Sequence, residues 1–160
     1  MAISTPHSIA SLKYINRDEL SSQLLASPND PDIAIVDVRG DDYLGGHIRG
    51  GINVPSENLD WQAPELARKL KDKKAVVFHC ALSQQRGPSA ALKYLKERDR
   101  LGIGKTEGEE GKKEGEEKKE GEEEQQVLVL EGGFVKWQEK YGKDKRLTEA
   151  YAEDIWKFGY

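Results

Sequence analysis

The sequence predicts an α/β fold, a single domain in which one parallel sheet is covered by helices on both faces. Short apolar runs recur along the chain, and each has the composition of a strand that is buried on both sides. Segments with apolar residues at helical spacing separate these runs over short connections. The length of 160 residues suits one domain.

The first elements are a strand, a helix and a second strand. Lys13–Ile15 fits a short strand. Asn16 is a good N-cap for the next helix, because Glu19 three residues later completes a capping box. This helix should stop before Pro28, since the residue before a proline avoids helical angles. The apolar run Ile33–Val36, between acidic residues, indicates a buried strand.

Strands and helices alternate through the rest of the chain. Residues 51–54 fit a short strand that ends before a proline. Residues 64–71 fit a helix with proline in its first turn, where the missing amide hydrogen is tolerated. The apolar runs 75–78 and 127–130 indicate two more buried strands. Apolar and aromatic residues at helical spacing predict helices at 88–100, 134–141 and about 147–158.

Two segments stand apart from this pattern. Residues 1–11 are expected to be a flexible leader to a domain that spans 12–160. Residues 102–126 contain ten Glu and five Lys, and they repeat Glu-Gly-Glu-Glu three times. Because such a segment has nothing to bury, we expect a disordered acidic insert in a loop. It is either a solvated spacer or an interaction segment.

Composition restricts the partners and the compartment. The net charge is −4, and 20 basic and 19 acidic residues remain outside the insert, so neither nucleic acid nor a membrane surface is an expected partner. Cys80 is the single cysteine, and no Cys/His pattern with zinc spacing predicts a metal site. With no secretory signal or membrane-length apolar run, we expect the cytoplasm or nucleus. The oligomeric state stays open.

The chemistry is predicted to lie in the loop after the strand at 75–78. Five residues separate Cys80 from Arg86, enough to wrap N–H groups around a tetrahedral anion at the start of a helix. Arg86 offers two parallel donors to two anion oxygens. The same field stabilises a thiolate, which can attack a bound phosphorus or arsenic atom in line. Cys80 and Arg86 are thus the predicted catalytic residues, against the alternative of a buried structural cysteine. The predicted backbone ligands are Ala81, Leu82, Ser83, Gln84 and Gln85.

Neighbouring residues are candidates for support. The Ser83 hydroxyl either donates to the sulfur or stabilises the turn. His79 either orients the loop through its ring or simply ends the strand. Gly87 suits a tight junction between loop and helix.

Three motifs resemble a known family. Residues 35–39 with 43–55 resemble the first signature of rhodanese-fold domains, and Leu130–Trp137 resembles the second. The loop His79–Pro88 is similar to that of M-phase inducer phosphatases and of the eukaryotic arsenate reductases related to them. The resemblance runs from about residue 14 to 141 without the insert, and implies a rhodanese-like parallel sheet.

The resemblance also implies the activity and leaves two reactions open. The first is a phosphatase of protein-tyrosine or dual-specificity type, which acts on phosphotyrosine-like or small phosphomonoesters through a cysteinyl-phosphate intermediate without a cofactor. The second is an arsenate reductase, which with one cysteine needs glutathione and a glutaredoxin as electron source. Sulfurtransferases of the family have a shorter loop, and a non-catalytic anion-binding module needs no reactive thiolate, so both are disfavoured.

The chain departs from its relatives at several points. M-phase inducers carry an acidic residue after the catalytic cysteine, where this chain has Ala81, and plant members carry zinc ligands that this chain lacks. No residue is predicted as the general acid. Asp37 is expected to join Arg39 and His47 in a structural network behind the loop. Glu131 either orients the loop arginine or satisfies turn amides.

Overall fold

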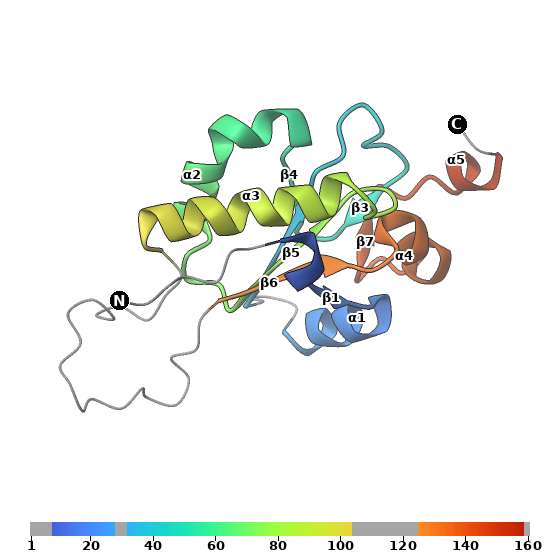
Figure 1. Ribbon diagram of the computed structural model, residues 1–160. Helices are drawn as coiled ribbons and strands as arrows, with labels where there is room; N and C mark the ends of the chain where they lie inside the picture. Colours follow the sequence, from blue (N-terminus) through green and yellow to red (C-terminus); the bar gives the residue numbers. More distant parts are fainter. Residues whose placement is uncertain (1–7, 28–31, 104–124, 159–160) are drawn as a thin grey trace.

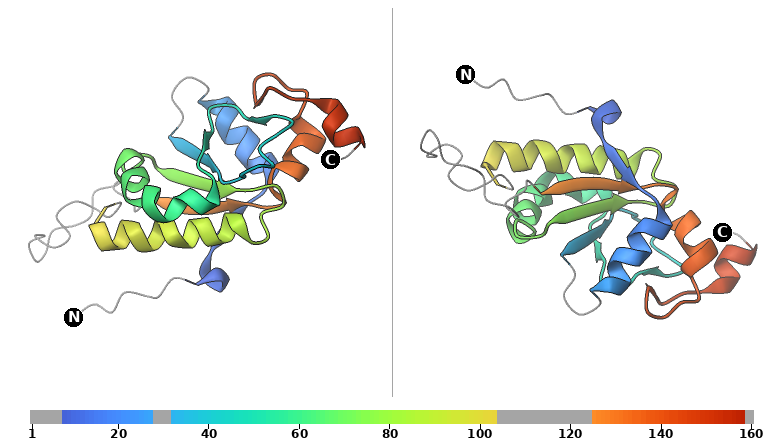
Figure 2. Two further views of the ribbon diagram at one scale, coloured as in Figure 1. Left: turned by 90° about the horizontal axis from the view of Figure 1, so that it is seen from above. Right: turned by 90° about the horizontal axis from the view of Figure 1, so that it is seen from below.

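The computed structural model describes residues 8–27, 32–103 and 125–158. Five parallel strands form a sheet in the order β1-β6-β5-β2-β4, with helices on both faces (Figures 1 and 2). The predicted fold class is therefore confirmed. The strands are β1 (Lys13–Ile15), β2 (Ile33–Asp37), β4 (Ile52–Asn53), β5 (Ala75–His79) and β6 (Gln126–Leu130). The helices are α1 (Arg17–Ala26), α2 (Leu59–Lys69), α3 (Arg86–Leu101), α4 (Gly133–Tyr141) and α5 (Glu153–Phe158).

Strand β5 lies at the centre of the sheet. Val77 pairs with Ile35 of β2 on one side and with Leu128 of β6 on the other. Every residue of β5 is buried. The strand therefore delivers Cys80, the next residue, to the middle of the carboxyl edge, where open parallel sheets bind ligands.

Apolar side chains form two cores, one on each face of the sheet. Val76 and Phe78 of β5 belong to the core under α2 and α3. Val77, between them in sequence, belongs to the core under α1 and α4, with the fully buried Phe134 and Trp137. Because alternate side chains enter opposite cores, β5 reads as a continuous apolar run.

The start of α1 follows its sequence signal. The Asn16 side chain accepts the amide of Glu19 at 2.8 Å, and the Glu19 carboxylate accepts the amide of Asn16 at 3.2 Å. This reciprocal pair confirms the predicted capping box. The helix ends at Ala26, before the proline, as predicted.

Two helices begin earlier than predicted. Helix α2 starts at Leu59, so Pro64 lies inside it and not in its first turn. Leu59 and Ala63 are both buried against the core, and this packing outweighs the one hydrogen bond that the proline lacks. Helix α3 starts at Arg86, two residues before Pro88, which falls in the first turn, where proline is tolerated.

The C-terminal segment differs from the single helix predicted at about 147–158. Residues Thr148–Glu149 form strand β7, which pairs antiparallel with β3 (His47–Ile48). Helix α5 then covers Glu153–Phe158 only. Strands of two residues are too short to show a period of two in the sequence, so packing decides them.

Parts of the predicted organisation lie outside the described residues. These are positions 1–7 of the leader and 104–124 of the acidic insert. The described ends of the insert correct its predicted bounds, since Gly102 caps α3 and Gln126 is already the first residue of β6. Within the described ranges, no helix has the length and apolar character needed to cross a membrane.

Candidate active site

Cys80 is the centre of the site. Its side chain is 3% exposed, and its sulfur accepts a hydrogen bond of 3.1 Å from the amide of Ser83. Ser83 has a φ of 56°, in the left-handed region, so the loop bends sharply at this residue. The sulfur thus touches the core under α3 on one side and a backbone donor of its own loop on the other.

Other donors of the loop are unused. Across the described part of the chain, the amides of Ala81, Leu82, Gln84 and Gln85 have no acceptor. The Ser83 hydroxyl is buried there without a hydrogen-bond partner. The first-turn amides of α3 also lack intrahelical acceptors, as at every helix start. Unused donors in a short loop that begins at a buried sulfur suit a tetrahedral oxyanion.

Arg86, the first residue of α3, is held by Asp42. Its Nη1 and Nη2 donate to the two carboxylate oxygens of Asp42 at 2.7 and 2.6 Å. The Arg86 hydrogen bonds lower the pKa of Asp42 despite its partial burial. The Asp42 carboxylate, with a smaller contribution from Cys80 nearby, raises the pKa of Arg86. The guanidinium therefore donates through both Nη atoms to the Asp42 carboxylate, and Cys80 is near enough to contribute to its raised pKa.

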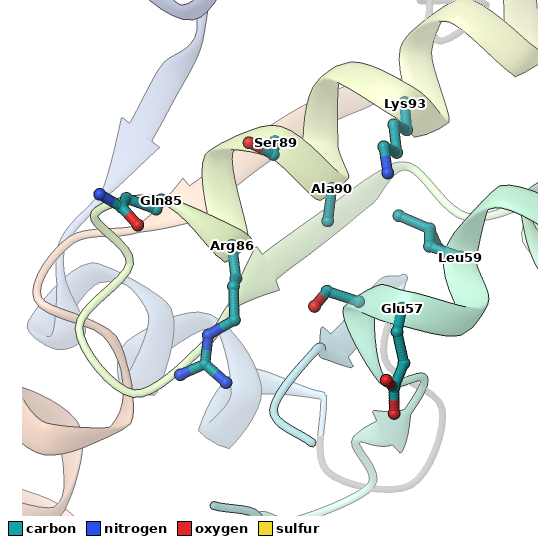
Figure 3. Close-up of a pocket in the computed structure, with 8 residues that line it drawn as sticks. Glu57, Leu59, Gln85, Arg86, Ser89, Ala90 and Lys93 are labelled. Atoms are coloured by element: carbon teal, nitrogen blue, oxygen red, sulfur yellow. The ribbon is translucent and has the colours of Figure 1, made fainter. Parts of the chain in front are cut away.

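A pocket of about 220 Å³ adjoins Arg86. Figure 3 shows Arg86 and Lys93 on the side of α3 that faces Glu57 and Leu59. Lys93 pairs with Asp60 at 2.8 Å, at the start of α2. The pocket lies between the starts of α2 and α3, and Arg86 lines it whereas Cys80 does not. The lining residues are Ser56, Glu57, Leu59, Gln85, Arg86, Ser89, Ala90 and Lys93.

Two residues fix the base of the loop. The Nδ1 atom of His79 lies 3.0 Å from the carbonyl oxygen of Cys80, so it is the protonated nitrogen of the ring. Complete burial lowers the pKa of His79, and the ring is neutral. At Gly87 a Cβ would lie 3.3 Å from the Cα of His79 and 3.4 Å from the Ser83 hydroxyl. The absence of a side chain at Gly87 lets α3 begin against the loop.

Behind the loop lies a buried ion pair. The Nε atom of Arg39 donates to both carboxylate oxygens of Asp37 at 3.0 Å. The Nη2 atom of Arg39 donates to Oδ2 of Asp37 at 2.7 Å. Arg39 also donates to the carbonyl oxygen of Gly46 and stacks 4.4 Å above the ring centre of Phe134. His47 is not in this network: it lies 3.3 Å from Glu149 at the partly exposed β3–β7 pair. The expected network therefore contains Asp37 and Arg39 without His47.

The start of α4 binds the other side of the loop. The amides of Phe134 and Val135 donate to the carbonyl oxygens of Cys80 and Ala81 at 3.0 and 2.9 Å. A Cβ at Gly133 would lie 2.4 Å from the Ala81 oxygen, so only glycine fits this contact. The second signature and the cysteine loop, which are distant in sequence, thus meet at Cys80.

Comparison with known proteins agrees with this geometry. The rhodanese-like domain family matches residues 20–140. The chain belongs to the rhodanese-like domain family. It is 35% identical to the CDC25-like phosphatase YCH1 of Saccharomyces cerevisiae, over 94% of this chain and 98% of that one. It is 37% identical to arsenate reductase 2.2 of rice, over 74% and 78%. The solved structure of Ygr203w, a yeast protein tyrosine phosphatase of the rhodanese family, has a TM-score of 0.65 and 34% identity, over 93% and 99%.

This rhodanese-like domain brings most of the predicted site residues together, but a residue that was not predicted binds Arg86. The carboxylate that holds Arg86 is Asp42, whereas the Glu131 side chain is exposed and makes no hydrogen bond in the described ranges. This corrects the expectation that Glu131 orients Arg86 or satisfies turn amides. The contact between Ser83 and the sulfur comes from the amide and not from the hydroxyl. The available signal for Asp42 was its place just after β2, at the edge that carries the loop.

The described side chains form no cluster of potential metal ligands. Among the described residues, no group of three or more His, Cys, Asp or Glu side chains is placed to hold a metal ion.

Proposed function

We propose that this rhodanese-like domain is a cysteine-dependent phosphatase that acts on phosphotyrosine-like or small phosphomonoesters. The observation that carries the proposal is the loop from Cys80 to Arg86, in which the amide of Ser83 donates to the buried sulfur and four other amides have no acceptor among the described residues. The relatives named as phosphatases in yeast support it. The pocket beside Arg86 offers space for the group that carries the phosphate.

The proposed reaction has two steps. The Cys80 thiolate attacks phosphorus in line, the bond to the leaving oxygen breaks, and a cysteinyl-phosphate forms. Water then attacks the phosphorus, the sulfur–phosphorus bond breaks, and phosphate leaves. In both steps the loop amides and Arg86 stabilise the charge on the equatorial oxygens. Both Nη atoms of Arg86 donate to Asp42, so the fork that these two atoms form becomes available to the substrate when Asp42 leaves it.

Arsenate reduction is the second candidate, favoured by the likeness to a rice arsenate reductase. The same thiolate would attack arsenate in this reaction. Cys80 is the single cysteine, so the chain has no second thiol to reduce the intermediate. Glutathione would supply the electrons, and a glutaredoxin would release the mixed disulfide. Neither reaction calls for a resident cofactor, and the cytoplasm or nucleus is the compartment in which we place the protein.

A side-by-side assay tests the proposal. One arm offers p-nitrophenyl phosphate, and the other offers arsenate with glutathione, glutaredoxin and an NADPH-linked readout. We expect the first arm to be the faster, and Cys80→Ser to abolish turnover in both arms while phosphate still binds. Full activity of Cys80→Ser in both arms would exclude this site as the reactive centre. Activity confined to the arsenate arm would mean that the protein is an arsenate reductase and not a phosphatase.

A further inference from the structure

A phosphatase needs a proton for the leaving oxygen, and the loop between Cys80 and Arg86 contains no carboxyl group. Of the carboxyl groups near the carboxyl edge of the sheet, two are poorly placed. Asp37 is 2% exposed, with both oxygens bound by Arg39. Glu131 is exposed, and its side chain makes no hydrogen bond in the described ranges. Asp42 and Glu57 remain.

Asp42 is placed better than Glu57. Both Asp42 oxygens lie within 2.7 Å of Nη1 and Nη2 of Arg86, the arginine that ends the loop. Glu57 lines the adjoining pocket, where its side chain makes no hydrogen bond with described residues (Figure 3). The Asp42 side chain is 26% exposed, so it is accessible to a substrate yet anchored, since its Oδ1 also accepts the amide of Gly40 at 3.1 Å.

We propose that Asp42 is the general acid of this phosphatase, freed for the role when the substrate oxyanion takes Arg86 from it. This inference rests on the proposed function. In the ligand-free molecule, Asp42 and Arg86 neutralise each other. A substrate that binds in the loop replaces the carboxylate on both Nη atoms, and Asp42 is left beside the new anion.

The exchange of partners changes the protonation of Asp42. While Arg86 is bound, its hydrogen bonds hold the pKa of Asp42 down and the group is a carboxylate. After the exchange, Asp42 has lost two donors and faces negative charge, and both changes favour the protonated form. Asp42 then takes a proton from water as the substrate binds. Substrate binding itself therefore brings Asp42 into its protonated, proton-donating form.

The proton balance closes over one turnover. The Cys80 sulfur forms a bond to phosphorus while the bond to the leaving oxygen breaks. The Asp42 proton passes to that oxygen, which leaves as an alcohol or phenol. Asp42, now a carboxylate, takes a proton from the water that attacks the cysteinyl-phosphate, and Cys80 returns to a thiolate. Phosphate departs, Asp42 releases that proton to the solvent as its pKa falls again beside Arg86, and the ion pair re-forms.

The proposal predicts two opposite effects for Asp42→Asn. Oxyanion binding should tighten, because the variant lacks the carboxylate that competes for Arg86. Bond cleavage should slow, but only where the leaving group needs a proton. The asparagine oxygen still accepts the Gly40 amide, so the local turn is expected to fold. A purely structural role for Asp42 would weaken binding and slow every substrate alike.

The experiment compares phenyl phosphate with p-nitrophenyl phosphate, whose phenolate leaves with little help. For Asp42→Asn we expect kcat for phenyl phosphate to fall about 100-fold or more, and kcat for p-nitrophenyl phosphate to change only about 3-fold. The inhibition constant of inorganic phosphate should fall. Asp41→Asn is the matched control, since Asp41 is exposed and makes no hydrogen bond in the described ranges, and it should leave all three values unchanged.

Three outcomes would overturn the assignment. Equal losses on both substrates would make Asp42 a positioning residue for Arg86. A selective loss on phenyl phosphate in Glu57→Gln, and not in Asp42→Asn, would make Glu57 the acid. If the wild-type protein hydrolyses neither substrate, the phosphatase function itself fails, whereas the first two outcomes leave that function standing.

Discussion

The amide of Phe134 donates a hydrogen bond of 3.0 Å to the carbonyl oxygen of Cys80. The same oxygen lies 3.0 Å from the ring nitrogen Nδ1 of His79. The peptide group that follows Cys80 is therefore fixed from two sides, by α4 and by the end of β5. These two contacts within the protein hold the loop after Cys80, as a preorganised anion site requires.

Gly133→Ala tests this contact. The new Cβ would lie 2.4 Å from the Ala81 oxygen at a φ of +61°, so α4 must move away from the loop. Gly50→Ala is the matched control, because its φ is +80° with nothing within 4 Å. We expect about 1–2 kcal/mol of destabilisation for Gly50→Ala, and a larger loss with reduced phosphatase activity for Gly133→Ala. Equal stabilities and activities in urea unfolding and turnover assays would argue against the contact.

Arg86→Lys should lower kcat/KM for p-nitrophenyl phosphate by about 100-fold or more, because an ammonium cannot present two parallel donors to the phosphoryl oxygens. Arg100→Lys is the control: Arg100 pairs with Glu97 at the other end of the same helix. Its kinetics should match the wild type. Unchanged kinetics in Arg86→Lys would contradict a bidentate role for this arginine.

Asp37→Asn should cost about 3–5 kcal/mol of unfolding free energy, because it leaves the fully buried Arg39 without a countercharge. Asp144→Asn breaks a similar contact with Arg146 at the surface and should cost less than about 1 kcal/mol. Urea unfolding of the two variants measures the difference. Similar losses would mean that the Asp37–Arg39 pair is not essential to the domain.

His79 should make the protein less stable in mild acid. Burial lowers its pKa from 6.5, so below that pH the unfolded chain binds more protons than the folded one. The free energy of unfolding should then fall by up to about 1.4 kcal/mol per pH unit below 6.5, until the folded pKa is passed. His79→Asn keeps a donor for the Cys80 oxygen and should lose this slope, while His47→Asn should keep it. The same slope in all three proteins would refute the assignment.

The sheet was predictable because burial on both faces leaves a local signature. The runs at β2, β5 and β6 are continuously apolar, and the capping box of α1 lies within four residues. Strands that form only by pairing with a distant segment have no such local sequence pattern. Strands β3 and β7 form only because Ile48 and Thr148 meet in the folded chain.

The candidate site divides in the same way. Cys80, Arg86 and the loop between them are local, so their spacing predicts an anion cradle. Asp42 lies 44 residues from Arg86, and nothing in its own neighbourhood distinguishes it from Asp41. Only the return of the β2–β3 segment to the carboxyl edge of the sheet selects one of the two aspartates as the partner of Arg86.

Rapid acid quench of the protein during turnover of a phosphorus-labelled aryl phosphate, followed by peptide mapping, tests most directly whether the buried sulfur is the nucleophile. We predict a phosphoryl group on Cys80 in the wild-type protein, and no labelled peptide from Cys80→Ser. Label on another residue, or steady turnover with no label on the sulfur at any quench time, would contradict the account.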